Sequence, residues 1–140
     1  MIIKCNIEDF DSTVKKVLLD WNRDLGIKIN KKSESVSREA AKMLRKGGPY
    51  KERTRKYTRD WSSKLNPNGY RYTRGHYDVY TVYNKKNYRL THLLENGHRI
   101  ISHGHARGRT TKAFVHIKPV ADFCETKMIN EVEEVIKGGA

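Results

Sequence analysis

A stripe of apolar residues dominates the first forty positions of the chain. Its N-terminal members recur mostly every three or four positions, and they are Ile7, Phe10, Val14, Val17, Leu18, Trp21 and Leu25. The pattern continues more weakly from Ile29 to Leu44 and stops at Gly47-Gly48-Pro49, a sequence that terminates helices. It predicts an amphipathic helix from about Ile7 to Lys46. Because glycine inside a helix costs about 1 kcal/mol relative to alanine, a break into two helices at Gly26 is the alternative.

Short runs with strand character follow this helix. Residues 50–59 are basic and poor in aliphatic side chains, so they predict a mobile loop. Residues 61–65 predict a strand that Trp61 opens, and residues 66–69 have the composition of a turn. The β-branched and aromatic residues from Tyr77 to Tyr83 alternate in the manner of a strand and complete a predicted hairpin.

A short helix and a loop are predicted in the next segment. Three leucines lie at helical spacing between residues 89 and 96, and Asn96-Gly97 has the composition of a helix C-cap. Residues 100–111 contain Gly104, Gly108 and several cations, which predicts an exposed loop.

The chain ends with a predicted strand and a predicted helix. Residues 113–117 alternate as a last strand, and Pro119 suits the first turn of a helix. The apolar face of this helix consists of Val120, Phe123, Cys124, Met128, Val132 and Ile136. Residues 1–140 therefore predict a single α+β domain with a long N-terminal helix, a small mostly antiparallel sheet with a short inserted helix, and a C-terminal helix.

The amino-acid composition limits the size of the hydrophobic core and indicates the cellular compartment. Only 36% of residues are hydrophobic and 32% are charged, which suffices for one core and leaves room for stabilisation by partner subunits. Cys5 and Cys124 match no metal or disulfide motif, so we expect two buried free thiols. No run has the length and apolarity of a secretory signal or a membrane span, so we expect the protein to stay in the cytoplasm where it is made.

Positive charge is concentrated in the middle of the chain. Of the formal net charge of +13, residues 31–75 contribute +10 and residues 76–118 contribute +6, whereas residues 119–140 carry −3. A cationic field of this kind favours nucleic acid as a partner and acidic protein surfaces second. The alternative interpretation is a solvated basic face that keeps the protein in solution.

Histidines suggest a metal site, but their surroundings argue against one. His92, His98, His103 and His105 fall within 14 residues, and Glu95 is the only nearby carboxylate. Zinc sites usually need thiolate or carboxylate partners on rigid elements, and the neighbouring arginines would repel a divalent cation. The sequence also lacks nucleophile motifs and phosphate-binding glycine loops. We therefore expect no metal, no cofactor and no catalysis.

The candidate binding residues are cations in two segments predicted to be loops. They are Arg53, Arg55, Lys56, Arg59, Arg107 and Arg109. Aromatic residues interleave with the first group, an arrangement that suits stacking on bases beside phosphate contacts. For Trp61, which opens a strand, packing in the core is the preferred interpretation, and it is the alternative for Tyr57.

The most specific motif of the chain runs from Leu90 to His98. It reads Leu90-Thr91-His92-Leu93-Leu94-Glu95-Asn96-Gly97-His98 and follows Tyr88-Arg89. The motif resembles the signature of a family of small neck or tail-completion proteins of long-tailed double-stranded DNA phages, which are encoded among the head-to-tail joining genes. Residues 116–120 are similar to the family's step into its last helix. The loop after the first helix departs from the family, because its Arg-Thr run lacks the usual glycine.

The resemblance implies a structural virion protein at the head-to-tail junction of a siphophage, with neck, tail-completion or tail-terminator duty. It implies a homo-oligomeric ring, a hexamer, around the DNA channel, with neighbouring connector and tail proteins and the phage DNA as partners, and no membrane. In physical terms, the three leucines would anchor the short helix on the sheet, Asn96-Gly97 would end it, and Glu95 would accept from a cation. His92 and His98 would then be hydrogen-bonding framework residues.

Two other functions remain open at this point. The first is a free-standing basic nucleic-acid-binding protein, and the second, less favoured, is a metal-dependent nuclease built on the histidines. Defined oligomers without sequence-specific DNA binding would favour the structural role.

Overall fold

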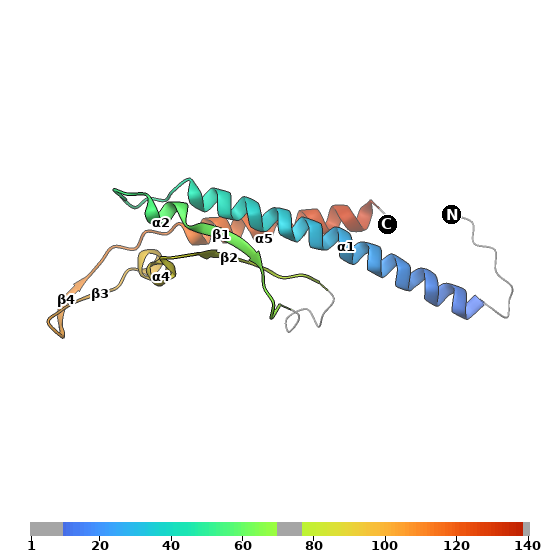
Figure 1. The fold of residues 1–140 in the computed structure, drawn as a ribbon, viewed down its shortest axis with the longest axis horizontal. Helices are drawn as coiled ribbons and strands as arrows, with labels where there is room; N and C mark the ends of the chain where they lie inside the picture. Colours follow the sequence, from blue (N-terminus) through green and yellow to red (C-terminus); the bar gives the residue numbers. More distant parts are fainter. Residues whose placement is uncertain (1–9, 70–76, 139–140) are drawn as a thin grey trace.

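The protein has the predicted α+β class, as a computed structural model that describes residues 10–69 and 77–138 shows (Figure 1). Its elements in chain order are α1 (Phe10–Arg45), α2 (Lys56–Arg59), β1 (Trp61–Leu65), β2 (Tyr80–Asn84), α4 (Tyr88–Asn96), β3 (Arg99–Ser102), β4 (His105–Thr110) and α5 (Ile117–Lys137). The helix start predicted at Ile7 and the thiol of Cys5 lie outside the described residues. Among the described residues, no helix has the length and apolarity needed to cross a membrane.

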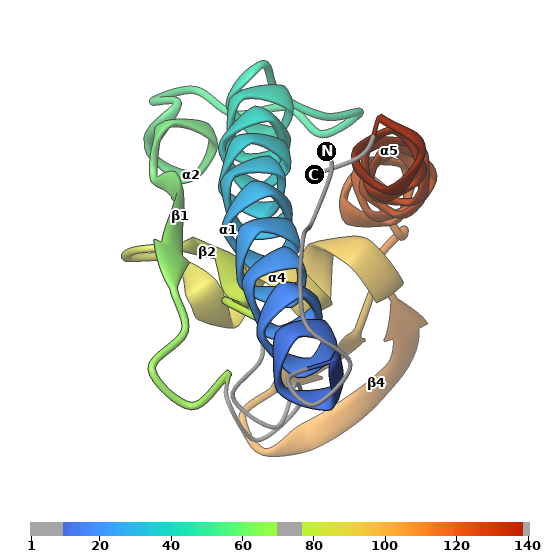
Figure 2. The ribbon, with the colours of Figure 1, turned by 90° about the vertical axis from the view of Figure 1, so that its right-hand side faces the viewer.

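The long helix α1 is continuous through Gly26, so the predicted alternative of a break is wrong. Figures 1 and 2 show α5 beside the C-terminal half of α1 and antiparallel to it. Two ion pairs join the helices, Lys32 with Glu131 and Glu39 with Lys127. Because this pairing places residue 131 opposite residue 32, α5 ends opposite the middle of α1, and the preceding part of α1 extends beyond it.

The core is small and lies where α1, α2, β1 and α5 meet. Its buried members are Ala40, Leu44, Tyr57, Trp61 and Val120. The predicted packing of Trp61 in the core is confirmed, and Tyr57 packs there as well. Strands β1 and β2 pair antiparallel, with Trp61 opposite Asn84, and this ribbon contacts α1. The predicted turn between them contains a hydrogen bond from the N–H of Gly69 to the carbonyl of Asn66.

Three predictions about the strands differ from the structure. In place of the single sheet, the described residues form two separate two-stranded sheets, β1–β2 and β3–β4. The loop predicted at residues 100–111 is largely the β3–β4 hairpin, whose turn residues His103 and Gly104 both have positive φ, as a type I′ turn requires. Residues 113–116 form no strand, because Phe114 donates its N–H to the carbonyl of Leu94 and the chain then enters α5.

The basic segment of residues 50–59 is held in place, contrary to the predicted mobile loop. Its second half is the short helix α2, in which Tyr57 and Thr58 are buried. The carboxylate of Glu52 accepts the backbone N–H groups of both residues and the Thr58 hydroxyl. These bonds satisfy donors at the start of α2 that have no partner within the helix, and they fix the segment against the core.

Candidate functional site

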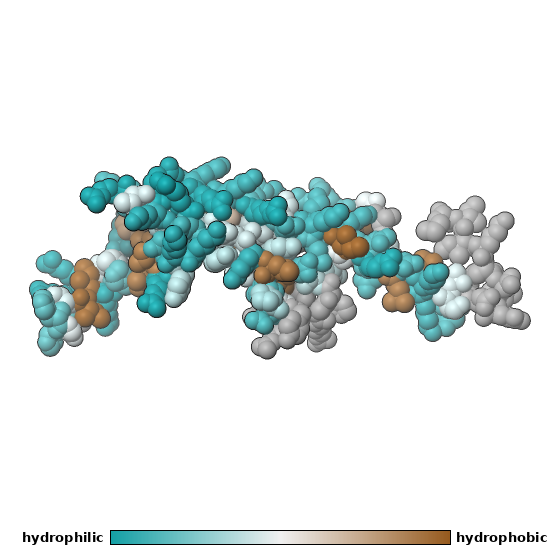
Figure 3. Space-filling model, in the orientation of Figure 1, coloured by the Kyte–Doolittle hydropathy of each residue, from teal (hydrophilic) through white to brown (hydrophobic). Residues whose placement is uncertain are grey.

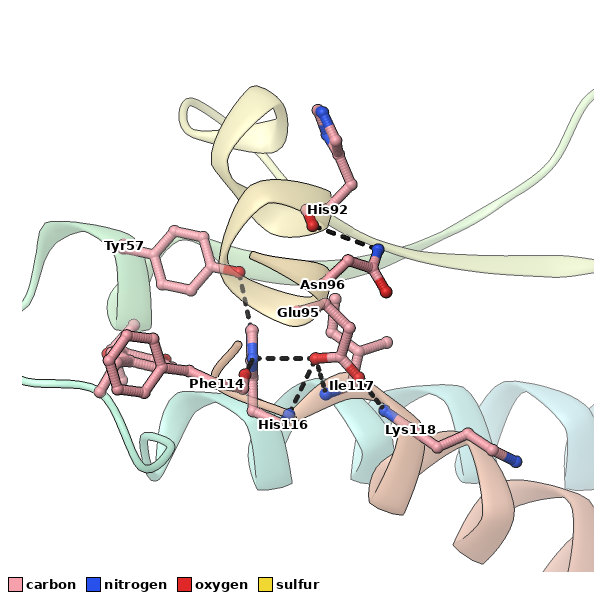
Figure 4. Close-up of polar contacts among 10 residues, drawn as sticks. Tyr57, His92, Glu95, Asn96, Phe114, His116, Ile117 and Lys118 are labelled. Carbon is pink, nitrogen blue, oxygen red and sulfur yellow. Dashed lines mark hydrogen bonds and ion pairs between the residues drawn. The ribbon is translucent and has the colours of Figure 1, made fainter. Parts of the chain in front are cut away.

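Hydrogen bonds join α4 to the start of α5, and Glu95 is the centre of this joint. From α4, the Glu95 carboxylate accepts the backbone N–H groups of His116 at 2.8 Å, Ile117 at 2.9 Å and Lys118 at 2.9 Å (Figure 4). The first N–H groups of a helix have no acceptor within it, and a carboxylate there also complements the positive end of the helix dipole. The side chain of His116, at the N-cap position, makes no capping bond itself. Glu95 therefore supplies the cap of α5 from another helix.

This geometry changes the proton affinity of Glu95. Burial alone would raise the pKa of its carboxyl group, but the three N–H donors and the nearby His116 ring hold that pKa below its ordinary value. The carboxylate is consequently charged at neutral pH. The sequence predicts that Glu95 accepts from a cation, and its hydrogen-bond donors in the structure are instead the backbone amides at the start of α5.

The imidazole of His116 connects Glu95 to the core. Its Nδ1 lies 2.6 Å from the carbonyl of Phe114 and 3.1 Å from Glu95 Oε2. Since both neighbours only accept, we assign the proton to Nδ1. Its Nε2 then accepts from the hydroxyl of Tyr57 at 2.8 Å, and the rings of Tyr50 and Trp61 pack edge-on around it. Figure 4 shows Tyr57 reaching this ring from α2.

Tyr57, His116 and Glu95 line up in the order hydroxyl, imidazole and carboxylate, which is the order of a hydrolytic triad. Their environment does not suit that chemistry. Tyr57 is only 5% exposed, and burial, followed by the nearby charges, raises the pKa of its hydroxyl. The hydroxyl therefore stays protonated at neutral pH and is covered from solvent. The arrangement fixes three segments to one another, and we interpret it as a structural joint.

A second buried polar group supports Tyr57 from the other side. Asn84, the most deeply buried large side chain among the described residues, donates from Nδ2 to the Tyr57 carbonyl at 2.8 Å. Its Oδ1 accepts the N–H of Asn87 at 2.9 Å, at the start of α4. The end of β2 is thus tied both to α2 and to α4.

The motif leucines differ in their surroundings. Leu94 packs against the core cluster, as expected for a residue that anchors α4. Leu93 is half-buried, whereas Leu90 is 44% exposed and does not anchor the helix on the sheet. Of the three leucines, only Leu94 packs against the core cluster.

The end of the motif forms the base of the hairpin. Gly97 has φ of 71°, and a Cβ atom there would lie 2.5 Å from the carbonyl oxygen of Thr111. His98 bonds to Thr111 through its backbone and through Nδ1, which lies 3.0 Å from the threonine hydroxyl. The framework role expected for His98 thus matches the contacts. His92 contributes its backbone carbonyl, which accepts from Asn96 Nδ2, while its ring is exposed.

The candidate cations lie at one end of the long axis but on two separate projections. Arg53, Arg55, Lys56 and Arg59 are exposed around α2, and Arg107 and Arg109 are exposed on β4 (Figures 1 and 2). Arg55 has φ of 54°, a left-handed conformation at the start of α2. The structure does not bring the two groups into one patch, although both face solvent as binding groups must.

The described histidines and acids do not form a metal site. No group of three or more His, Cys, Asp or Glu side chains in residues 10–69 and 77–138 is arranged to hold an ion. Cys124 is a free, half-buried thiol, whose pKa burial raises above its ordinary value. It packs against the core rather than being fully buried.

Comparison of the chain with protein-family models, curated proteins and solved structures gives no match. Sequence reasoning did not find the network of Tyr57, Asn84, Glu52 and His116. The only local signal was the position of His116 just before Pro119, which suits a helix start. Tyr57 and His116 are 59 positions apart, so only the tertiary structure relates them.

Proposed function

We propose that this chain is a structural subunit of the head-to-tail junction of a long-tailed phage, which assembles with copies of itself into a ring around the DNA channel. The carrying observation is that residues of the phage-like motif build a joint. Glu95 caps α5, Gly97 admits the close approach of Thr111, and His98 closes the base of the hairpin. A motif whose residues make such contacts stabilises the fold of a subunit, which is the role expected of a structural protein.

The uncovered apolar residues of α1 support self-assembly. About 17 residues, 10–26, extend beyond the end of α5, which at 1.5 Å per residue is about 25 Å. We call this segment the α1 arm. Its exposed apolar side chains are Val14, Leu18, Leu19 and Trp21, and they continue the stripe that is buried further along the helix at Val36 and Leu44. Figure 3 shows apolar patches along the arm.

Several exposed apolar side chains along one helix, as found here, are typical of protein interfaces. Burial of one leucine side chain is worth about 1.5–3 kcal/mol, so a partner that covers the arm would add substantially to the stability of a chain with so small a core. The second projection, the β3–β4 hairpin, leaves the other end of the molecule (Figure 1). Two different projections at opposite ends suit head-to-tail contacts, which close into rings.

The exposed cations also support the second candidate, a free-standing basic nucleic-acid-binding protein. Arg53, Lys56 and Arg59 are exposed and rigidly mounted, and such groups release counterions when they contact phosphates. A ring subunit would use the same cations on the DNA that passes through its channel. The two functions therefore differ in assembly state more than in surface chemistry.

Size analysis of the full chain by light scattering, with and without a duplex DNA fragment, tests the proposal. We expect a defined oligomer in the absence of DNA and weak, salt-sensitive DNA binding without sequence preference. A monomer at every concentration that binds one DNA sequence tightly would contradict the proposal and favour the regulator.

A further inference from the structure

The β3–β4 hairpin is a cationic ribbon that the rest of its own chain leaves bare. It carries Arg99, Arg107 and Arg109, and no acidic residue occurs between Glu95 and Asp122. Ile101 is 67% exposed, and the strands make their close contacts almost entirely with each other. An isolated two-stranded ribbon is marginally stable in water, so a hairpin of this kind gains stability from a surface to lie on.

The outer face of α5 carries the opposite charge. Asp122, Glu125, Ile129, Glu133 and Ile136 follow one another at steps of three or four residues, which places them in one stripe along the helix. All five are exposed, and Ile129 is 54% exposed. The only lysine between Asp122 and Ile136, Lys127, turns inward to Glu39. We call this set the α5 outer stripe.

The salt bridges at the two ends of the α5 outer stripe do not prevent it from binding a partner. Asp122 pairs with Lys118 and Glu133 pairs with Lys137, each four residues away and each exposed. Exposed pairs of this type contribute only about 0.3–0.5 kcal/mol and exchange partners readily. Glu125 lies between them in the stripe.

We infer that the β3–β4 hairpin of one copy binds the α5 outer stripe of a second copy. Charge favours this partner surface, because the segment that contains α5 carries a net charge of −3 over residues 119–140, whereas residues 31–118 carry +16. The middle of the chain, in contrast, is strongly cationic and would repel a hairpin that has three arginines and no carboxylate. Isoleucines on both sides add apolar contact between the charges.

The dimensions of the two surfaces agree. The six residues of β4 span about 20 Å at about 3.3 Å per residue. The stripe from Asp122 to Ile136 spans about 21 Å at 1.5 Å per residue. Because hairpin and stripe are different surfaces, each copy can bind one neighbour through its hairpin and another through α5, which produces a ring or a filament. This inference depends on the self-association proposed above and not on the phage assignment.

A charge-swap experiment on the full chain tests the interface. The hairpin variant carries Arg107→Glu and Arg109→Glu, and the helix variant carries Glu125→Lys and Glu133→Lys. Each should raise the apparent dissociation constant of the oligomer about tenfold or more, and the four substitutions together should restore assembly. A control with Lys85→Glu and Lys86→Glu, exposed in the turn before α4, makes the same charge change away from the interface and should assemble normally.

Circular dichroism of each variant verifies that the helices remain. An oligomer that the hairpin variant leaves intact overturns this interface while leaving self-association in place, and so does failure of the four-substitution chain to reassemble. A hairpin variant that keeps its oligomer but no longer retains a DNA fragment identifies phosphate as the occupant instead. Wild-type protein that is monomeric at every concentration contradicts both this interface and the proposed ring.

Discussion

Glu95 in α4 holds the backbone of His116 at the entrance to α5, with 2.8 Å between carboxylate and amide nitrogen. The hairpin lies between these two residues in sequence, and His98 and Thr111 close its base. Both ends of the segment between Glu95 and His116 are therefore hydrogen-bonded to the rest of the domain, while the hairpin within it projects into solvent. The hairpin therefore projects from a hydrogen-bonded base on a small domain.

Glu95→Gln should weaken the protein at neutral pH. The amide keeps one acceptor oxygen but loses the charge that three N–H groups and the helix dipole favour, so we expect a loss of about 1–2 kcal/mol in the free energy of unfolding. Urea denaturation of both proteins at pH 7 measures this difference in the free energy of unfolding. An unchanged midpoint would mean that solvent caps α5 equally well.

The same variant should change the pH dependence of stability. Because folding lowers the pKa of Glu95 below its ordinary 4.5, its contribution is present above that value and is lost as pH falls through the lower, folded pKa. The difference between wild type and Glu95→Gln should therefore be full at pH 7 and shrink below about pH 4. Denaturation curves at several pH values test this, and a difference that grows on acidification would contradict it.

Leu94→Ala should destabilise the fold while Leu90→Ala should not. Leu94 packs on the core cluster, whereas Leu90, one turn earlier in α4, is 44% exposed and does not contact that cluster. Removing a packed leucine costs about 2 kcal/mol or more, and an exposed substitution costs about 0.5 kcal/mol or less. At this chain length the first loss lowers the melting temperature by several degrees. Equal melting temperatures for the two variants would show that the core does not depend on Leu94.

Gly97→Ala should disturb the hairpin base more than Gly104→Ala disturbs its tip. Both glycines have positive φ, but a Cβ at Gly97 would lie 2.5 Å from the Thr111 carbonyl, and one at Gly104 meets nothing within 4 Å. The tip variant therefore bears only backbone strain, about 1 kcal/mol, while the base variant must also move the chain at Thr111. Amide hydrogen exchange of Thr111 reports the difference, and similar exchange in both variants would refute the steric argument.

The parts of the fold that were predictable are those with a local signal. The apolar stripe gave α1, the alternation around Val82 gave β2, and Pro119 marked the start of α5. The hairpin was missed because His103-Gly104 is an unusual type I′ turn and Gly108 interrupts the alternation of β4. Its exposed strands also lack the apolar periodicity that burial imposes.

The joint itself could be predicted only in part. Glu95 and Gly97 belong to the Leu90–His98 motif, and the charge of Glu95 predicts that it is a hydrogen-bond acceptor. Its actual partners lie 21 to 23 positions away, and the hydroxyl that meets His116 is 59 positions away. Contacts between distant segments depend on how elements pack, which a single sequence does not state.

Protein purified without a histidine tag should contain well under one equivalent of zinc or manganese. His98 is engaged with Thr111, His103 lies beside Ser102, and Arg107 and Arg109 add positive charge to the same hairpin. Cation repulsion and the shortage of anionic ligands both disfavour a divalent ion there. Elemental analysis after dialysis measures the content, and a stoichiometric metal that survives would contradict the structural interpretation of these histidines.

Removing the cations around α2 should impair assembly of infectious particles without unfolding the protein. The variant replaces four exposed side chains, and its substitutions are Arg53→Ser, Arg55→Asn, Lys56→Ser and Arg59→Ser. Asparagine is chosen at position 55 because it tolerates the left-handed backbone found there. Exposed substitutions usually cost about 0.5 kcal/mol or less each, so the melting temperature should fall only slightly.

The measurement for this variant is complementation of a phage that lacks the gene, with infectious particles and retained DNA counted. Because cations mounted in a ring contact phosphates or an acidic neighbour many times over, their joint loss should reduce the yield strongly. A matched control removes four exposed lysines outside the α1 arm, the hairpin and the α5 outer stripe. These are Lys31, Lys64, Lys85 and Lys86, and the control should rescue the phage. If the variant around α2 rescues as well as this control, its charge serves solubility alone. If both fail equally, net charge and not position determines the outcome.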